Sequence, residues 1–175
     1  MTTPRLILFA VLFYIFVDLS KSDETCLGSD RYKSFNKIGN NYYLIHHSNK
    51  INWFNARDTC KRMGADLATI TDDNQLTLLS KHLMSLGYGK DDWFWIAGND
   101  LGQEGNFYWV SNGERMTFAK WSQGQPDNDH NNKVEDCVHL WFREGQFKMN
   151  DWQCKNGKAY YICQAPQPKT VCIWG

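Results

Sequence analysis

The sequence predicts an α+β domain with two early helices, an antiparallel sheet joined by long loops, and stabilising disulfides. Three observations support this fold class. Helical periodicity is confined to two segments in the first half of the chain. After residue 93, short apolar runs alternate with stretches rich in Gly, Asn and Asp, as expected of strands and loops. Six cysteines follow an apolar N-terminal segment.

The N-terminal segment resembles a secretory signal peptide. An apolar run covers residues 6–17, which is the length of a signal-peptide core and short of the roughly 20 residues that span a bilayer. Ser20 and Ser22 supply the small residues expected before a cleavage site. We therefore expect residues 1–22 to be removed and residues 23–175 to form one secreted domain. An uncleaved membrane anchor is the alternative.

Each helical segment has an apolar stripe between a capping residue and a glycine. The first is expected to begin after Asn52 and to stop at Gly64. In the second, Asp72 and Gln75 have the spacing of a capping box, and Gly87 is the expected stop. The stripes are Trp53, Ala56 and Cys60 in the first helix, and Leu76, Leu79, Leu83 and Leu86 in the second.

Composition excludes several classes of function. The formal net charge is zero and no block of like charge occurs, so neither nucleic-acid binding nor a polybasic membrane-binding patch is expected. Membrane insertion of the mature domain is not expected either. No Cys-x-x-Cys pair occurs, which favours disulfides over zinc or redox chemistry. The sequence also lacks an HExxH motif, a nucleophile elbow and a phosphate-binding glycine loop. We therefore do not expect an enzyme.

The longest expected loop is unusually rich in side-chain oxygens. It covers residues 122–135 (SQGQPDNDHNNKVE), and Asn150 and Asp151 follow shortly after it. Calcium takes six to eight oxygen ligands from carboxylates, amides and carbonyls, which irregular loops can supply. The spacing of an EF-hand is missing. These residues predict a calcium-binding loop; a solvated loop that merely forms turns is the alternative.

Four motifs in one order resemble the C-type lectin family. Residues 95–98 (WIAG) resemble its WIGL core motif, and residues 125–127 match the QPD triplet of galactose-type members. Residues 135–137 match the acidic pair before a cysteine, and residues 150–154 resemble the WND…C motif, with Met149 in place of its Trp. The resemblance implies the C-type lectin-like fold, and the chain is most similar to small secreted galactose-specific lectins of insects.

The resemblance implies one main calcium site, which also binds the sugar. Its expected ligands are Gln125, Asp127, Glu135, Asn150 and Asp151. The ion is expected to coordinate two sugar hydroxyls, with further sugar contacts from Gln125, Asp127, Glu135 and Asn150. The order of Gln and Asp around the proline is that of galactose-type members. The family further implies a cis peptide bond between Gln125 and Pro126.

Two further features carried over from the family are an auxiliary calcium site and a sugar-stacking residue. The auxiliary ligands are expected to be Asp100, Glu104, Asn128 and Asp136. Asn128 stands where a carboxylate is common, so a weaker or vacant site is expected; ordinary surface acids are the alternative. No Trp follows the triplet, and His130 takes its place as a candidate stacking residue, against the alternative of a solvated histidine. The other tryptophans are expected to be structural.

The resemblance also implies two disulfides, Cys60–Cys163 and Cys137–Cys154. The remaining pair, Cys26 and Cys172, is expected to form a third bridge because the chain ends lie together in this fold. Pairing between chains, which would give a covalent homodimer, is the alternative.

These residues together predict a secreted calcium-dependent lectin for glycans that contain galactose or N-acetylgalactosamine. Its partners would be glycans on cell or microbial surfaces, in pathogen recognition, innate immunity or agglutination. The alternative is a domain of the same fold that binds a protein or another non-sugar ligand. Such members typically lose the calcium ligands, whereas all five positions here carry suitable oxygens.

Overall fold

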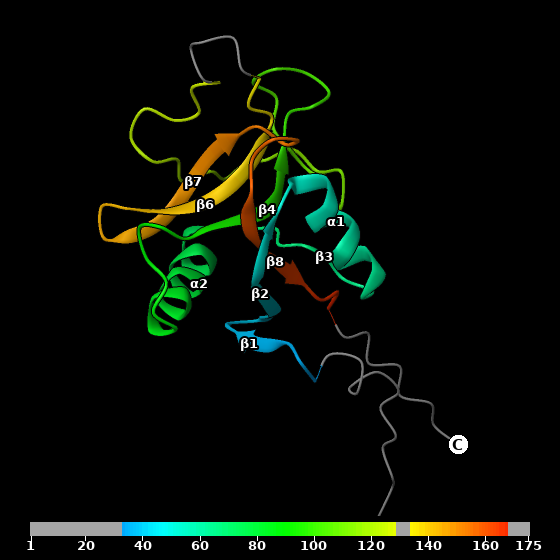
Figure 1. The fold of residues 1–175 in the computed structure, drawn as a ribbon, viewed down its shortest axis with the longest axis vertical. Coiled ribbons are helices and arrows are strands. Elements are labelled where there is room, and N and C mark those ends of the chain that lie inside the picture. Colours follow the sequence, from blue (N-terminus) through cyan, green and yellow to red (C-terminus); the bar gives the residue numbers. More distant parts are fainter. Residues whose placement is uncertain (1–32, 129–133, 168–175) are drawn as a thin grey trace, which may run out of the picture. The chain divides into compact units, whose positions relative to one another are not determined.

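The computed structural model describes residues 33–128 and 134–167. Within them the chain forms the predicted α+β fold, with two helices and a sheet (Figure 1). In chain order the elements are β1 Asn36–Ile38, β2 Asn41–Ile51, α1 Trp53–Arg62, β3 Asp66–Leu67, α2 Asp73–Ser85, β4 Trp93–Asn99, β5 Tyr108–Trp109, β6 Cys137–Arg143, β7 Gln146–Trp152 and β8 Ala159–Gln164.

Both helices begin at the predicted capping residues. The Asn52 side chain accepts a hydrogen bond from the backbone N–H of Asn55 (2.9 Å), and Asp72 accepts one from the N–H of Gln75 (2.8 Å). Gln75 Oε1 accepts from the N–H of Thr71 (2.7 Å), one residue before the position that a standard capping box would use.

The predicted core stripes are confirmed except at Leu86. This side chain is 52% exposed, because α2 ends at Ser85 and Leu86 is already its C-cap. Gly87 follows with a φ of +88°, a conformation that glycine adopts without steric cost.

The sheet is mixed, which corrects the expectation of an antiparallel one. Its strand order is β1-β2-β8-β4-β6-β7, with β3 paired to β8 and β5 paired to β4. The pair β4–β8 is parallel, and all the other pairs are antiparallel. Strand β4 lies between β8 and β6, and five successive residues of it are buried. A strand buried on both faces has no polar alternation, which is why its apolar run is continuous.

Two predicted disulfides are confirmed. Cys60–Cys163 links α1 to β8, and Cys137–Cys154 links the start of β6 to the turn after β7. The first spans 103 residues of sequence, a loop whose closure stabilises a fold by roughly 4–5 kcal/mol in the chain-entropy model. The proposed Cys26–Cys172 bridge and the signal peptide at residues 1–22 lie outside the described residues.

The hairpin of β6 and β7 positions the loop region. In its register His139 lies opposite Asn150, and Val138 lies opposite Asp151. The segment before the long loop is tied to β7 by two backbone hydrogen bonds, from Met149 N–H to the Lys120 carbonyl and from Ser122 N–H to the Met149 carbonyl (both 2.9 Å). Met149 itself is fully buried. Among the described residues, no helix has the length and apolar character needed to cross a membrane.

Candidate metal centre

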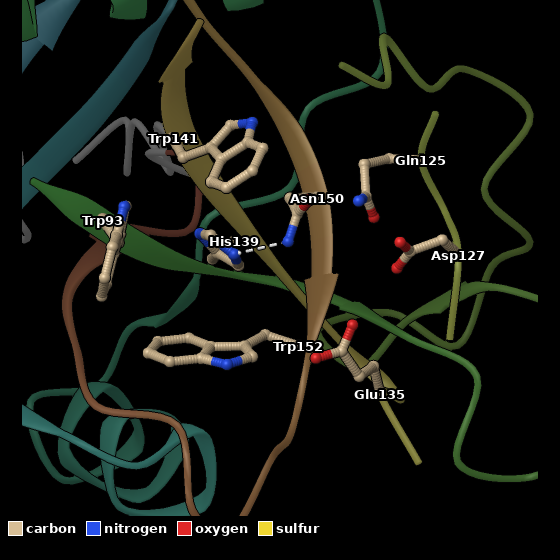
Figure 2. Close-up of a pocket in the computed structure, with 8 residues that line it drawn as sticks. All are labelled: Trp93, Gln125, Asp127, Glu135, His139, Trp141, Asn150 and Trp152. Atoms are coloured by element: carbon tan, nitrogen blue, oxygen red, sulfur yellow. Dashed lines mark hydrogen bonds between the residues drawn. The ribbon is translucent and has the colours of Figure 1, made fainter. Parts of the chain in front are cut away.

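Three carboxylates converge beside β7. Asp127, Glu135 and Asp151 each offer an oxygen, and these oxygens lie within 4.8 Å of one another. Across residues 33–128 and 134–167, this is the one acidic group with the geometry to hold a metal ion. Gln125 and Asn150 line a cavity together with two of these carboxylates (Figure 2). We call these five residues the principal cluster.

Two amide oxygens of the principal cluster are buried without a hydrogen-bond partner among the described residues. They are Gln125 Oε1 and Asn150 Oδ1. Leaving a buried acceptor unsatisfied costs about 1–3 kcal/mol, so native proteins rarely leave two of them side by side. A bound cation would satisfy both oxygens. Three carboxylates and two amide oxygens are also the hard donor set that calcium prefers, so the residues present fit this ion.

Asp151 ties the long loop to the sheet. It is only 1% exposed, and its two carboxylate oxygens accept from the backbone N–H groups of Asp127 (3.3 Å) and Asn128 (2.9 Å). Burial raises the pKa of Asp151, an effect that these two hydrogen bonds partly offset and that the nearby Asp127 increases. A cation in the cluster would act in the opposite direction and favour the ionised form.

His139 controls the orientation of Asn150. Burial lowers the pKa of His139 to about 3, so its ring is neutral at physiological pH. The Asn150 amide nitrogen donates to His139 Nε2 (2.9 Å; Figure 2). It also donates to the carbonyl of Asp151. His139 Nδ1 then carries the proton and faces the Leu140 carbonyl at 3.4 Å. With both of its N–H groups engaged, the Asn150 amide is held in one orientation and keeps its Oδ1 without a partner among the described residues.

The amide among the predicted auxiliary ligands is hydrogen-bonded at both ends, unlike the two amides of the principal cluster. We call Asp100, Glu104, Asn128 and Asp136 the auxiliary cluster. Asn128 Nδ2 donates to Glu104 Oε2 (2.6 Å), and Asn128 Oδ1 accepts from the backbone N–H of Glu135 (2.7 Å). Both polar ends of this amide are therefore used within the protein. Asn128 also has a φ of +48°, a left-handed conformation that asparagine tolerates better than most residues.

Asp100 is the buried acid of the auxiliary cluster. Its Oδ2 accepts from the backbone N–H of Gly105 (2.8 Å), while its Oδ1 has no partner among the described residues. Burial raises the pKa of Asp100 to about 6, with smaller contributions from Glu104 and Asp136. The acids of this cluster are near enough to interact, yet they do not form a group with metal-binding geometry as the principal cluster does. Calcium binding here stays a prediction.

Two predicted features of the site remain, the cis peptide bond and the stacking residue. The peptide bond between Gln125 and Pro126 is cis, as the family resemblance implied. His130, the candidate stacking residue, lies outside the described residues.

Sequence reasoning missed the second half of the cavity. The cavity has a volume of about 310 Å³ and extends from the principal cluster to Trp93, Trp141 and Trp152, with His139 between the two halves (Figure 2). The three tryptophans were expected to be structural, and His139 was not singled out. The one local signal was a histidine inside the apolar run of residues 137–142.

Comparison with known proteins shows the family. A model of the family described as "Lectin C-type domain" matches residues 49–165. C-type lectin 37Da of Drosophila melanogaster is 34% identical over 79% of this chain and 75% of its own length. C-type lectin 37Db of the same species is 36% identical over 73% of this chain and 79% of its own.

The fold has solved counterparts as well. The carbohydrate-recognition domain of the mouse scavenger receptor C-type lectin superimposes with a TM-score of 0.66 at 23% identity, over 77% of this chain and 97% of that domain. That similarity concerns the fold alone, whereas the family match and the two fly proteins concern the sequence. This chain belongs to the C-type lectin domain family.

Proposed function

We propose that this chain is a secreted calcium-dependent lectin for glycans that contain galactose or N-acetylgalactosamine. Its calcium ion would be held by the principal cluster. The observation that carries the proposal is a pair of buried amide oxygens, on Gln125 and Asn150, that have no partner among the described residues and line the same site as three converging carboxylates. Membership of a lectin family makes a sugar the expected ligand and binding, rather than catalysis, the expected activity.

Calcium and the side chains of the cluster would make different contacts with the sugar. When bound, calcium supplies coordination positions for two neighbouring hydroxyls of the sugar. Asp127 and Glu135 can accept hydrogen bonds from these hydroxyls, and each such bond to a charged group is worth about 1.5–3 kcal/mol. Because both N–H groups of Asn150 already donate within the protein, Gln125 is the amide of this cluster that can donate to a hydroxyl.

The galactose preference rests on the triplet at residues 125–127. Its glutamine precedes the proline and its aspartate follows, which is the order of galactose-type members of the family. The natural ligands would be galactose-ended glycans on cells or microbes, and the role would be recognition or agglutination. Secretion rests on the signal-peptide pattern at residues 1–22. The oxidising secretory pathway would allow a third disulfide between Cys26 and Cys172.

Affinity chromatography tests the proposed function. The secreted protein should be retained on immobilised galactose in calcium and should elute with a chelator, whereas a mannose column should retain it less. Asn150→Leu removes one calcium oxygen without adding charge and should pass through the galactose column. Retention in excess chelator would contradict the mechanism, and tighter retention on mannose would contradict the sugar preference alone.

A further inference from the structure

We propose that the aromatic half of the cavity is a second subsite, which binds the flat apolar face of the group attached to the calcium-bound sugar. That group is either a neighbouring pyranose ring or an aryl aglycone, since both present the same flat, C–H-rich surface. The inference rests on the proposed function, because the sugar anchored at the principal cluster delivers the group. We call the set Trp93, Trp141 and Trp152 the aromatic wall.

Continuity with the principal cluster identifies the occupant. One cavity is lined on one side by Gln125, Asp127, Glu135 and Asn150, and on the other by the aromatic wall (Figure 2). Its volume of about 310 Å³ is at the lower end of the range for ligand pockets, about 300–1,000 Å³. A ligand held at the polar side therefore has its next group directed along a surface of indole rings.

The exposure of the aromatic wall argues against a purely structural role. The same chain buries Trp53, Trp95 and Trp109 almost completely when they serve its core. The three tryptophans of the wall are only partly buried, and all of them border the same cavity. Leaving three large rings partly in water forgoes some hydrophobic stabilisation, which a bound apolar surface would restore.

The aromatic wall is rigid without a ligand. Trp152 stacks on Trp95 (ring centroids 5.5 Å apart, planes at 29°), and Trp93 meets Trp152 edge-on (5.1 Å, 78°). The Arg143 guanidinium lies 3.7 Å from the centroid of the Trp141 ring, and Lys50 Nζ lies 5.3 Å from that of Trp93. Rings fixed in this way lose little side-chain entropy on binding.

Two polar groups beside the wall are already engaged. Trp141 Nε1 donates to Ser122 Oγ (2.7 Å), and the Nε2 atom of His139 accepts from Asn150. What these two residues present to the cavity is therefore ring surface rather than free hydrogen-bonding capacity. Ring surface of this kind is complementary to the flat apolar face of a ligand.

Paired galactosides that differ only in the aglycone test this inference. Calorimetry at saturating calcium compares methyl galactoside with phenyl galactoside, in both anomeric forms. We expect the parent protein to bind the phenyl compound about tenfold more tightly in at least one anomer, as one well-packed aromatic contact allows. Trp152→Leu and Trp141→Leu should each reduce this ratio toward one while methyl galactoside affinity is kept. Tyr42→Leu, an aromatic replacement on β2 outside the cavity, should leave the ratio unchanged.

The outcomes separate this inference from the proposed function. Equal affinities for methyl and phenyl galactosides in the parent, for both anomers, would overturn the second subsite while leaving the lectin intact. So would a phenyl preference that survives in both leucine variants. If Trp152→Leu does not fold, Trp152→Phe should retain part of the ratio and Trp141→Leu decides. Failure of both galactosides to bind in calcium would instead contradict the proposed function, and the subsite with it.

Discussion

The principal and auxiliary clusters are built from the same loop region and the same types of side chain, yet they use their oxygens differently. In the principal cluster, Gln125 Oε1 and Asn150 Oδ1 are buried beside three carboxylates and accept nothing from the described residues. In the auxiliary cluster, the Asn128 amide already donates to Glu104 and accepts from the backbone of Glu135. Asp100 Oδ1 of the auxiliary cluster also lacks a partner among the described residues, but only the principal cluster brings three carboxylate oxygens within 4.8 Å of one another. Convergence of the oxygens is therefore a better sign of a metal site than their density, or than the lack of a partner at one of them.

Asn128 explains the difference. Its side-chain N–H donates to the Glu104 carboxylate. A carboxylate at position 128 would instead repel Glu104, and a cation would be needed to offset that repulsion. The hydrogen bond thus holds together two segments that a second calcium ion would otherwise bridge. The comparison predicts one strong calcium site and one region that is stable without an ion.

The largest effect is expected from removing a carboxylate of each cluster in turn. Glu135→Gln should weaken calcium binding by roughly 100-fold, since affinity depends on the number of charged ligands. Glu104→Gln is the matched change in the auxiliary cluster and should alter calcium affinity by less than about threefold, as expected for a group outside the site. Calcium titration by calorimetry measures both. A greater loss in Glu104→Gln would reverse the assignment of the two clusters.

The next effect concerns the residue that orients Asn150. His139→Leu removes the acceptor for the Asn150 amide, so the amide can rotate and its oxygen is no longer held in one orientation. Loss of such a supporting group typically lowers metal affinity by 10–100-fold, and we expect about tenfold. His139→Gln restores an acceptor oxygen and should recover most of that affinity, whereas a merely structural role would not distinguish the two variants. Equal losses in both would count against orientation by His139.

Local sequence rules predicted most of the fold. The caps at Asn52 and Asp72 act within one turn of their own helices, so residue type and spacing are sufficient to identify them. One error was local, because Leu86 continues the periodic pattern but falls after the end of α2. The other arose where distant segments decide, since the parallel pairing of β4 with β8 joins strands about 65 residues apart.

The site was predictable in one half only. Residues 125–127 and 150–151 lie in short motifs that resemble the family, so their order in the sequence identified the principal cluster. The aromatic wall has no such motif. Trp93, Trp141 and Trp152 come from β4, β6 and β7, and only the sheet order β4-β6-β7 brings them together. The pairing of His139 with Asn150 likewise depends on the register of a hairpin, which a single sequence does not reveal.

A smaller effect, on specificity, should be confined to the principal cluster. Replacing Gln125 by Glu together with Asp127 by Asn preserves the charge and nearly preserves both volumes, so calcium affinity should change little. Donor and acceptor exchange sides, and preference should move from galactose toward mannose. A shift of about 1.4 kcal/mol between the two sugars is enough to invert a tenfold preference. Calorimetry of both proteins with both sugars at fixed calcium measures it. A double variant that keeps its galactose preference would place selectivity elsewhere.

The smallest effect is expected from converting the auxiliary cluster toward the principal one. Asn128→Asp replaces the amide donor with a carboxylate facing Glu104, which removes a hydrogen bond and adds repulsion. Without calcium, the free energy of unfolding should fall by about 1 kcal/mol. With calcium the loss should be recovered, because the new carboxylate gives the ion a ligand. A second binding step should then appear in calorimetry.

Asn112→Asp is the matched control, since the Asn112 amide also donates to a glutamate, Glu114 (2.9 Å), at an exposed position. Urea unfolding of both variants with and without calcium makes the comparison. Recovery by calcium in Asn128→Asp but not in Asn112→Asp would show that a single amide keeps the auxiliary cluster from needing an ion, and equal behaviour of the two variants would remove Asn128 from that role.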